Sequence, residues 1–162
     1  MKRRYDTALY SSRIEKINNL ITDCCIGVDV IVGFPGEEEE DFLVTRSFLK
    51  NLDISYLHVF TFSDRVNTEA ASLNNKVSKE EKIYRSKTMH MISDEKRFEF
   101  QEKCLKQIRP VLFERSVNGM NQGYTDNYIK VQVAADMNYE NKLLEVTLNK
   151  NHGSYMSGLV TE

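Results

Sequence analysis

The chain has 162 residues, of which 41% are hydrophobic and 28% are charged. This length and composition allow one domain with a proper core, or two small domains. Lysine and arginine number 22 against 24 acidic residues, so the formal net charge of −2 excludes a global attraction to nucleic acid or to an anionic membrane. Any contact with RNA must therefore come from local patches of the surface.

Membrane and metal signals are weak in this sequence. No apolar run approaches the roughly 20 residues that span a bilayer, and no uninterrupted apolar signal core follows the basic start Met1–Arg4. We therefore expect a cytoplasmic protein that does not contact a membrane. Cys24, Cys25 and Cys104 lack the paired spacing of a zinc site, so we interpret them as reduced core residues and expect no metal ligands.

The first part of the chain is predicted to alternate helices and strands. Residues 6–23 predict an amphipathic helix, and residues 26–34 form a β-branched run typical of a buried strand in a parallel sheet. An acidic cluster opens a second predicted helix at residues 37–52, and residues 55–62 follow as a second strand. This order predicts right-handed parallel β/α units.

A long charged helix is predicted for residues 78–106, where Ser78 and Glu81 form a capping box. Its length suggests that it connects two parts of the protein. The predicted helices each present one apolar face, formed by Ile14, Ile17 and Ile21 in the first, by Phe42, Thr45, Phe48, Leu49 and Leu52 in the second, and by Ile83, Met91, Phe98 and Leu105 in the third.

Beyond Pro110 the pattern changes to period-two alternation, which is typical of strands. It occurs in residues 111–117, 128–133 and 144–148, with glycines between them. We therefore predict a small antiparallel β-barrel at residues 108–162. The fold class is α/β followed by a small all-β part.

The turn at the end of the first strand is one candidate site, with the sequence Gly33-Phe34-Pro35-Gly36-Glu37. The carboxyl end of a parallel strand is where β/α folds bind ligands. Gly33 and Gly36 let the backbone approach a ligand closely, and Glu37 can accept hydrogen bonds from an amine or hydroxyl. A purely structural glycine turn is the alternative interpretation.

The end of the second strand is another candidate, because Ser63 and Arg65 follow it at the same edge of the sheet. Arg65 suits a carboxylate or a phosphate, although a solvated loop arginine is an equal alternative. His58 lies inside this strand between apolar neighbours, and we interpret it as a core histidine rather than a ligand or a base.

The stretch from Gly123 to Val131 is the third candidate and is predicted to form one hairpin strand. Its polar and aromatic residues are Tyr124, Thr125, Asn127, Tyr128 and Lys130. Aromatic rings on a small barrel stack on unpaired bases, and a lysine holds phosphates. A tyrosine-rich strand that only packs is the alternative, since residues 106–162 hold six basic and six acidic residues.

These motifs together resemble one family. They are the opening Met1–Tyr5, the run Asp29–Glu37, His58–Phe60 with Ser63, Arg65, Thr68 and Ala70, and Gly123–Tyr128. In this order they resemble the radical-SAM methylthiotransferases, a MiaB-like family of tRNA-modifying enzymes, over nearly the whole chain. The MtaB branch is the most similar.

The resemblance implies a transferase that adds a methylthio group to C2 of N6-threonylcarbamoyladenosine beside the anticodon of tRNA. Its cofactors are S-adenosylmethionine and two [4Fe–4S] clusters. The C-x-x-x-C-x-x-C motif that holds the radical-SAM cluster is absent from this sequence. We therefore expect a carboxy-terminal fragment that is inactive alone.

The family's architecture implies two domains here. Residues 1–107 correspond to the second part of the radical-SAM barrel, a half TIM-like barrel with a long connecting helix. Residues 108–162 correspond to the TRAM domain, an RNA-binding β-barrel. The unpaired edges of a half barrel need cover, so we expect a homodimer.

The resemblance assigns functional roles to the residues of this chain that match the family's motifs. The resemblance places Gly33, Pro35, Gly36, Glu37, Ser63 and Arg65 around S-adenosylmethionine, and Tyr124, Thr125, Asn127, Tyr128 and Lys130 against RNA. The sequence departs from the family at Glu38, Thr61 and Asn67, where threonine, proline and glycine are usual.

Two other functions stay open. A stand-alone TRAM-type RNA-binding module would have no catalytic role, and its first part would serve only as a support. A branch of the family that modifies a ribosomal protein is less similar at Gly123–Tyr128.

Overall fold

A computed structural model describes residues 4–65, 68–134 and 137–161. Met1, Lys2, Arg3 and Asn67, which entered the family resemblance, lie outside the described residues. The chain divides into two compact units, one of Met1–Asn19 with Ile26–Lys96 and the other of Leu20–Cys25 with Arg97–Glu162. Within the described ranges no helix has the length and apolar character needed to cross a membrane.

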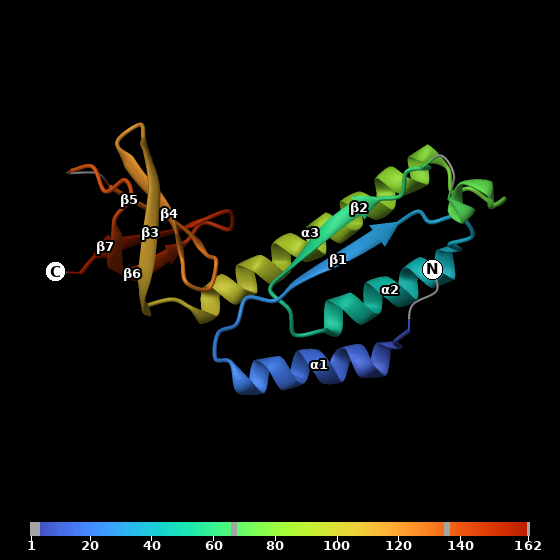
Figure 1. Ribbon diagram of the computed structural model, residues 1–162, viewed down its shortest axis with the longest axis horizontal. Coiled ribbons are helices and arrows are strands. Elements are labelled where there is room, and N and C mark those ends of the chain that lie inside the picture. Colours follow the sequence, from blue (N-terminus) through green and yellow to red (C-terminus); the bar gives the residue numbers. More distant parts are fainter. Residues whose placement is uncertain (1–3, 66–67, 135–136, 162) are drawn as a thin grey trace. The chain divides into compact units, whose positions relative to one another are not determined.

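The first unit contains a parallel sheet covered by helices. Its elements are α1 (Thr7–Leu20), β1 (Gly27–Val32), α2 (Glu39–Asn51), β2 (Tyr56–Thr61), the short 3₁₀ helix η1 (Glu69–Ser72) and most of α3 (Lys79–Lys103). β1 and β2 pair in parallel from Gly27 with Tyr56 to Val32 with Thr61, which confirms the predicted pairing. The two strands lie side by side in Figure 1.

One face of this sheet forms the core of the first unit. Val28, Val30, Val32 and Leu57 are buried there together with residues of the helices. His58 lies on the other face and is exposed, with its ring 4.8 Å from that of Tyr56. The interpretation of His58 as a core histidine was therefore wrong, because strand residues alternate between faces.

The buried faces of two helices differ from the predicted ones. In α1, Ile14 is buried and Ile17 is 36% exposed, and Ile21, just after this helix, is 55% exposed. In α3 the predicted face is exposed at Ile83, Met91 and Phe98. The buried residues are Phe100 and Gln101 near its end and, in its earlier turns, Arg85, Met89, Ile92 and Ser93. These four residues follow the spacing of a single helix face, but two of them are polar, so hydrophobic periodicity missed them.

The second unit contains a closed barrel. Its strands are β3 (Ile108–Val117), β4 (Met120–Thr125), β5 (Lys130–Ala134), β6 (Leu143–Asn151) and β7 (Met156–Val160), in the order β3-β4-β5-β7-β6 (Figure 1). β5 and β7 pair in parallel, so the barrel is not purely antiparallel as predicted. Its interior is filled by Val111, Phe113, Val131, Val146, Leu148 and Met156, together with Phe100 of α3 and Cys104 just after that helix.

The stretch predicted as one hairpin strand is a strand, a turn and a second strand. β4 ends at Thr125, whose N–H donates to the carbonyl of Ile129 at 3.0 Å, and β5 begins at Lys130. Tyr128 lies in the turn with φ 66°, a left-handed conformation. Asp126 and Asn127 are turn-forming residues, which explains why the chain reverses there.

Candidate functional site

The turn after β1 is held by its own hydrogen bonds. The N–H of Gly33 donates to Oε2 of Glu37 at 2.5 Å, and the N–H of Gly36 donates to the carbonyl of Asn75 at 2.9 Å. Both glycines have positive φ, 75° at Gly33 and 84° at Gly36, which explains the choice of glycine. The carboxylate of Glu37 therefore stabilises the turn from within.

Arg85 of α3 holds the same carboxylate, and sequence reasoning missed it. Its side chain is 1% exposed, and its Nη1 donates to Oε2 of Glu37 at 2.8 Å. Nη2 pairs with Glu81 at 2.5 Å and lies 3.5 Å from Glu39. Burial lowers the pKa of Arg85, but the hydrogen bond and charge of Glu37, together with Glu81, outweigh it and raise that pKa.

A cleft of about 680 Å³ opens beside this turn between α1, β1 and α2. Pro35, Gly36 and Glu37 line it, together with Tyr10 and Phe48. Its size falls in the range of small-molecule sites. A Cβ added to Gly36 would meet no atom within 4 Å, so the backbone there is open to approach.

Ser63 and Arg65 follow β2 and do not line this cleft. The loop that carries them nevertheless meets the Gly33 turn, because the rings of Phe34 and Phe62 lie 5.1 Å apart. Lys82 of α3 donates to the carbonyl of Phe62 at 3.2 Å. The two strand-end loops are therefore neighbours, and both Ser63 and Arg65 are exposed.

The structure offers no metal centre in its described part, where no group of three or more His, Cys, Asp or Glu side chains is placed to hold a metal ion. Cys104 is buried, and Cys24 and Cys25 are partly buried. The residues present here do not fit an iron–sulfur cluster.

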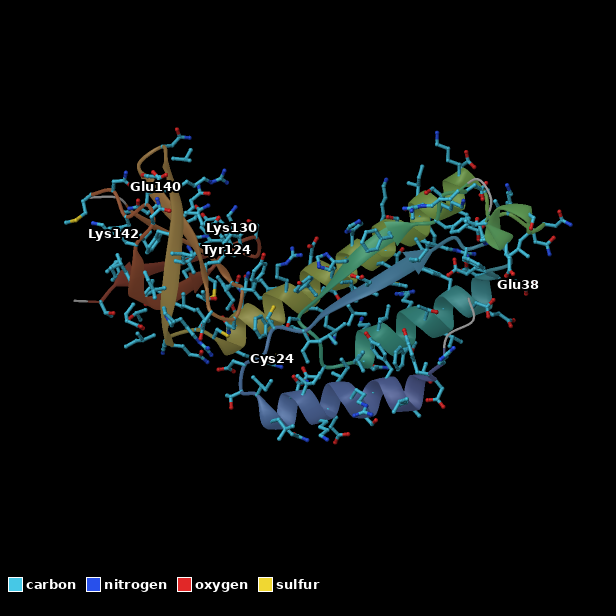
Figure 2. The ribbon with its side chains drawn as sticks, in the orientation of Figure 1. Cys24, Glu38, Tyr124, Lys130, Glu140 and Lys142 are labelled. Carbon is cyan, nitrogen blue, oxygen red and sulfur yellow. The ribbon has the colours of Figure 1, made fainter. Side chains whose placement is uncertain are left out.

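The barrel presents Tyr124, Tyr128 and Lys130 outward. The rings of Tyr124 and Tyr128 lie 5.2 Å apart at 31°, and Tyr128 is 71% exposed. Tyr124 is the cross-strand partner of Lys130, and Figure 2 shows these two side chains close together on the barrel. Two neighbouring aromatic rings at the surface beside a cation suit an unpaired base and its phosphate.

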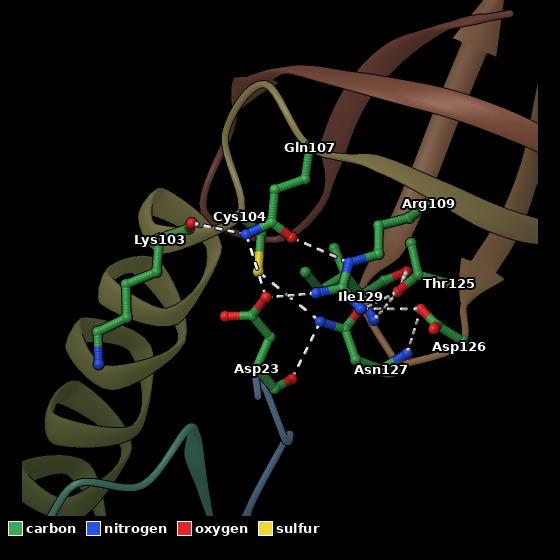
Figure 3. A network of polar contacts seen from close by, with 9 residues as sticks. All are labelled: Asp23, Lys103, Cys104, Gln107, Arg109, Thr125, Asp126, Asn127 and Ile129. Carbon is green, nitrogen blue, oxygen red and sulfur yellow. Dashed lines mark hydrogen bonds and ion pairs between the residues drawn. The ribbon is translucent and has the colours of Figure 1, made fainter. Parts of the chain in front are cut away.

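Thr125 and Asn127 point inward instead and hold the hairpin to the segment before β1 (Figure 3). The hydroxyl of Thr125 donates to Oδ1 of Asn127 at 2.7 Å. Nδ2 of Asn127 donates to the carbonyl of Asp23 at 3.2 Å and approaches Sγ of Cys104 at 3.7 Å. Thr125 is 5% exposed, so these two residues shape the surface from beneath.

Arg109 extends this network. Its Nη2 donates to Oδ2 of Asp23 at 2.5 Å, and its Nη1 lies 3.4 Å from Oδ1 of Asp126. Burial raises the pKa of the Cys104 thiol, and the hydrogen bond from Asn127 offsets part of that rise. Sequence reasoning missed Asp23 and Arg109, because no local pattern shows that they pair.

The chain is similar to tRNA-modifying enzymes along almost its whole length. It is 31% identical over 163 residues, covering 98% of the chain, to a threonylcarbamoyladenosine tRNA methylthiotransferase MtaB of Bacillus subtilis. It is 32% identical, again over 98% of the chain, to a tRNA-2-methylthio-N(6)-dimethylallyladenosine synthase of Wolinella succinogenes. An MtaB protein of Aquifex aeolicus is 40% identical over 73% of the chain. No family model matches the chain.

The chain belongs to the tRNA methylthiotransferase family. It matches the carboxy-terminal part of these proteins, as the resemblance predicted. It spans 36% of the length of the Bacillus protein and 37% of that of the Wolinella protein. The similarity therefore shows the family to which this chain belongs. It does not show that this chain has the activity of the longer enzymes.

Proposed function

We propose that this chain is the RNA-docking, carboxy-terminal part of a tRNA methylthiotransferase whose substrate is N6-threonylcarbamoyladenosine beside the anticodon. The observation that carries this proposal is the similarity over 98% of the chain to a threonylcarbamoyladenosine tRNA methylthiotransferase. The Wolinella dimethylallyladenosine synthase also matches over 98% of the chain, so the choice of substrate rests on the motifs of the MtaB branch. The enzyme would act in the cytoplasm.

The proposed domains follow the sequence motifs. Residues 1–107 would complete a radical-SAM β/α barrel, and residues 108–162 would form the TRAM domain. The parallel β1–β2 pair with its helices supports the first assignment, and the closed five-stranded barrel supports the second.

S-adenosylmethionine fits this chain in part. Pro35, Gly36 and Glu37 line a cleft of suitable size, and Gly33 shapes their turn. Ser63 and Arg65 would reach the ligand from the neighbouring loop. When bound, S-adenosylmethionine would supply the radical chemistry that removes hydrogen from the adenine carbon. The two clusters do not fit this chain, so their ligands would come from the rest of the enzyme.

The barrel would bind the anticodon loop of the tRNA. Tyr124 and Tyr128 would stack on unpaired bases, and Lys130 would contact a phosphate. Thr125 and Asn127 would support this surface through their inward hydrogen bonds.

Anaerobic reconstitution with iron and sulfide tests the catalytic part of the proposal. We expect this chain to hold no stoichiometric [4Fe–4S] cluster and to cleave no S-adenosylmethionine, because it lacks the cysteine motif. A cluster with its characteristic absorbance and S-adenosylmethionine cleavage would contradict the proposal.

Titration with an anticodon stem-loop tests the RNA-binding part. We expect Tyr124→Ala to weaken binding by about tenfold, since stacking contributes about 1–3 kcal/mol per base. The matched control is Tyr155→Ala, whose ring stacks on His152 in the segment between β6 and β7. Equal loss in both variants would contradict a specific role for Tyr124.

A homodimer would cover the open sheet of the first unit. The face opposite the helices exposes His58 and Phe60, and Phe60 is 52% exposed. Sedimentation at micromolar concentration should show a dimer. A monomer that binds no dye for exposed apolar surface would exclude this arrangement.

A further inference from the structure

The outer faces of neighbouring barrel strands carry two adjacent rows of side chains. The cross-strand register joins Lys130, Tyr124, Leu112 and Leu143 in one row. It joins Gln132, Gln122 and Arg115 in the next. All seven alternate with buried residues of the barrel or stand at its bulge, so they share the solvent face. These seven residues are called the platform below.

The apolar side chains of the platform lie outside the barrel core. Leu112 is 49% exposed and Leu143 is 67% exposed, while their neighbours Val111 and Leu144 pack inside. Single exposed leucines are ordinary, but a leucine pair in register with Tyr124 is a contiguous apolar strip. Tyr128 extends this strip, because its ring lies 5.2 Å from that of Tyr124.

Charge on the platform is positive although the barrel as a whole is balanced. β3, β4 and β5 contain three basic residues, Arg109, Arg115 and Lys130, and one acidic residue, Glu114. Arg109 is engaged with Asp23. Arg115 and Lys130 therefore outnumber the one acidic residue, Glu114, which lies at the bulge between Phe113 and Arg115.

We propose that the platform binds two or three unpaired nucleotides of single-stranded RNA. Bases stack on Tyr124 and Tyr128 and pack against Leu112, while Arg115 and Lys130 contact phosphates. The side-chain amides of Gln122 and Gln132 donate to and accept from base edges. The inference rests on the proposed docking of tRNA, and it extends the contact surface from the β4–β5 hairpin to β3 and β6.

Two variants of the whole chain test the platform by titration with a fluorescent anticodon stem-loop. Leu112→Thr removes apolar surface and keeps a residue that favours strands, and we expect about fivefold weaker binding. Its control is Leu159→Thr, since Leu159 is 68% exposed on β7, outside the platform. Arg115→Gln should reduce the slope of log affinity against log salt by about one, and Lys150→Gln on β6 is its control.

The outcomes separate the platform from the proposed function. Wild-type binding that weakens with Tyr124→Ala but not with Leu112→Thr or Arg115→Gln overturns the platform and leaves RNA docking in place. Absence of wild-type binding overturns both. Loss of self-association with Leu112→Thr, at unchanged RNA affinity, would make this surface a protein interface and overturn the platform.

Crosslinking provides a test that needs no variant. A stem-loop with 4-thiouridine in its loop, irradiated with the wild-type chain and mapped by mass spectrometry, should mark peptides within residues 108–132 or the peptide that contains Leu143. Crosslinks confined to other parts of the chain would overturn the inference.

Discussion

Arg85 places a positive charge inside the first unit, and three carboxylates compensate it. Glu37 is the most buried of them, with its side chain 13% exposed. The Nε of Arg85 has no hydrogen-bond partner among the described residues, so its stabilisation depends on Nη1 and Nη2. Removal of the guanidinium leaves the carboxylate of Glu37 buried with a single N–H donor among the residues that the structure describes, that of Gly33.

Arg85→Met is therefore expected to reduce the free energy of unfolding by about 3 kcal/mol or more. Arg46→Met on α2 is the matched control, because Arg46 is exposed, and its effect should stay within about 0.5 kcal/mol. Urea unfolding followed by circular dichroism measures both. Equal stability of the two variants would contradict the structural role of Arg85.

Asn127 and Tyr128 are adjacent but should differ in what they stabilise. Asn127→Ala removes the donor to the Asp23 carbonyl and should reduce the free energy of unfolding by about 1–3 kcal/mol. Tyr128→Asn should leave stability nearly unchanged, because its ring is exposed and asparagine tolerates the positive φ of 66°. Chemical denaturation measures the free energy of unfolding of both variants. A larger decrease for Tyr128→Asn than for Asn127→Ala would contradict the structural roles given to these two residues.

Burial changes the pH at which a cysteine thiol becomes reactive. Because burial raises the pKa of Cys104, its thiol stays protonated at pH values where an exposed cysteine has begun to ionise. Iodoacetamide should therefore label Cys24, which is half-buried (Figure 2), before Cys104 at pH 8 to 9. Mass spectrometry of the labelled peptides tests this order.

The stability that Cys104 contributes is present below the ordinary thiol pKa and is lost as the pH rises through its raised pKa.

At the level of elements, close contacts between strand backbones limit which residues a position can accept. Gly123 of β4 faces the backbone of β3, and a Cβ there would collide with the carbonyl oxygen of Leu112. β3 and β4 therefore pair closely beneath Tyr124. This contact explains why the glycine stands before the tyrosine.

Gly123→Ala should destabilise the barrel by more than about 2 kcal/mol, because backbone atoms of β3 would have to move. Gln122→Ala, the outward neighbour on β4, should change stability by less than about 0.5 kcal/mol. Thermal unfolding followed in the far ultraviolet compares them. Similar melting temperatures would contradict the close pairing.

The elements were predictable where periodicity dominates. The strand Gly27–Val32 and the helix Glu39–Asn51 lie within the predicted ranges, because a β-branched run and an acidic first turn are local signals. The buried face of α3 was not predictable, since Arg85 and Ser93 are buried through partners distant in sequence. The turn at Tyr128 was missed for a related reason, because alternation alone does not show where a strand reverses.

At the level of the whole molecule, the two units have separate cores. Phe42 belongs to one core and Phe113 to the other. The candidate residues divide in the same way, with the Gly33–Glu37 turn in the first unit and Tyr124 with Lys130 in the second. The motifs identified the family from sequence, whereas the engagement of Glu37 by Arg85 and of Asn127 by Asp23 required the structure.

Binding of the whole chain to an anticodon stem-loop, with and without threonylcarbamoyl adenosine and at two salt concentrations, tests the central proposal most directly. We expect salt-sensitive binding that is tighter for the anticodon stem-loop than for an unrelated stem-loop. Failure to bind either RNA at low salt would contradict the proposal that this part of the enzyme docks tRNA.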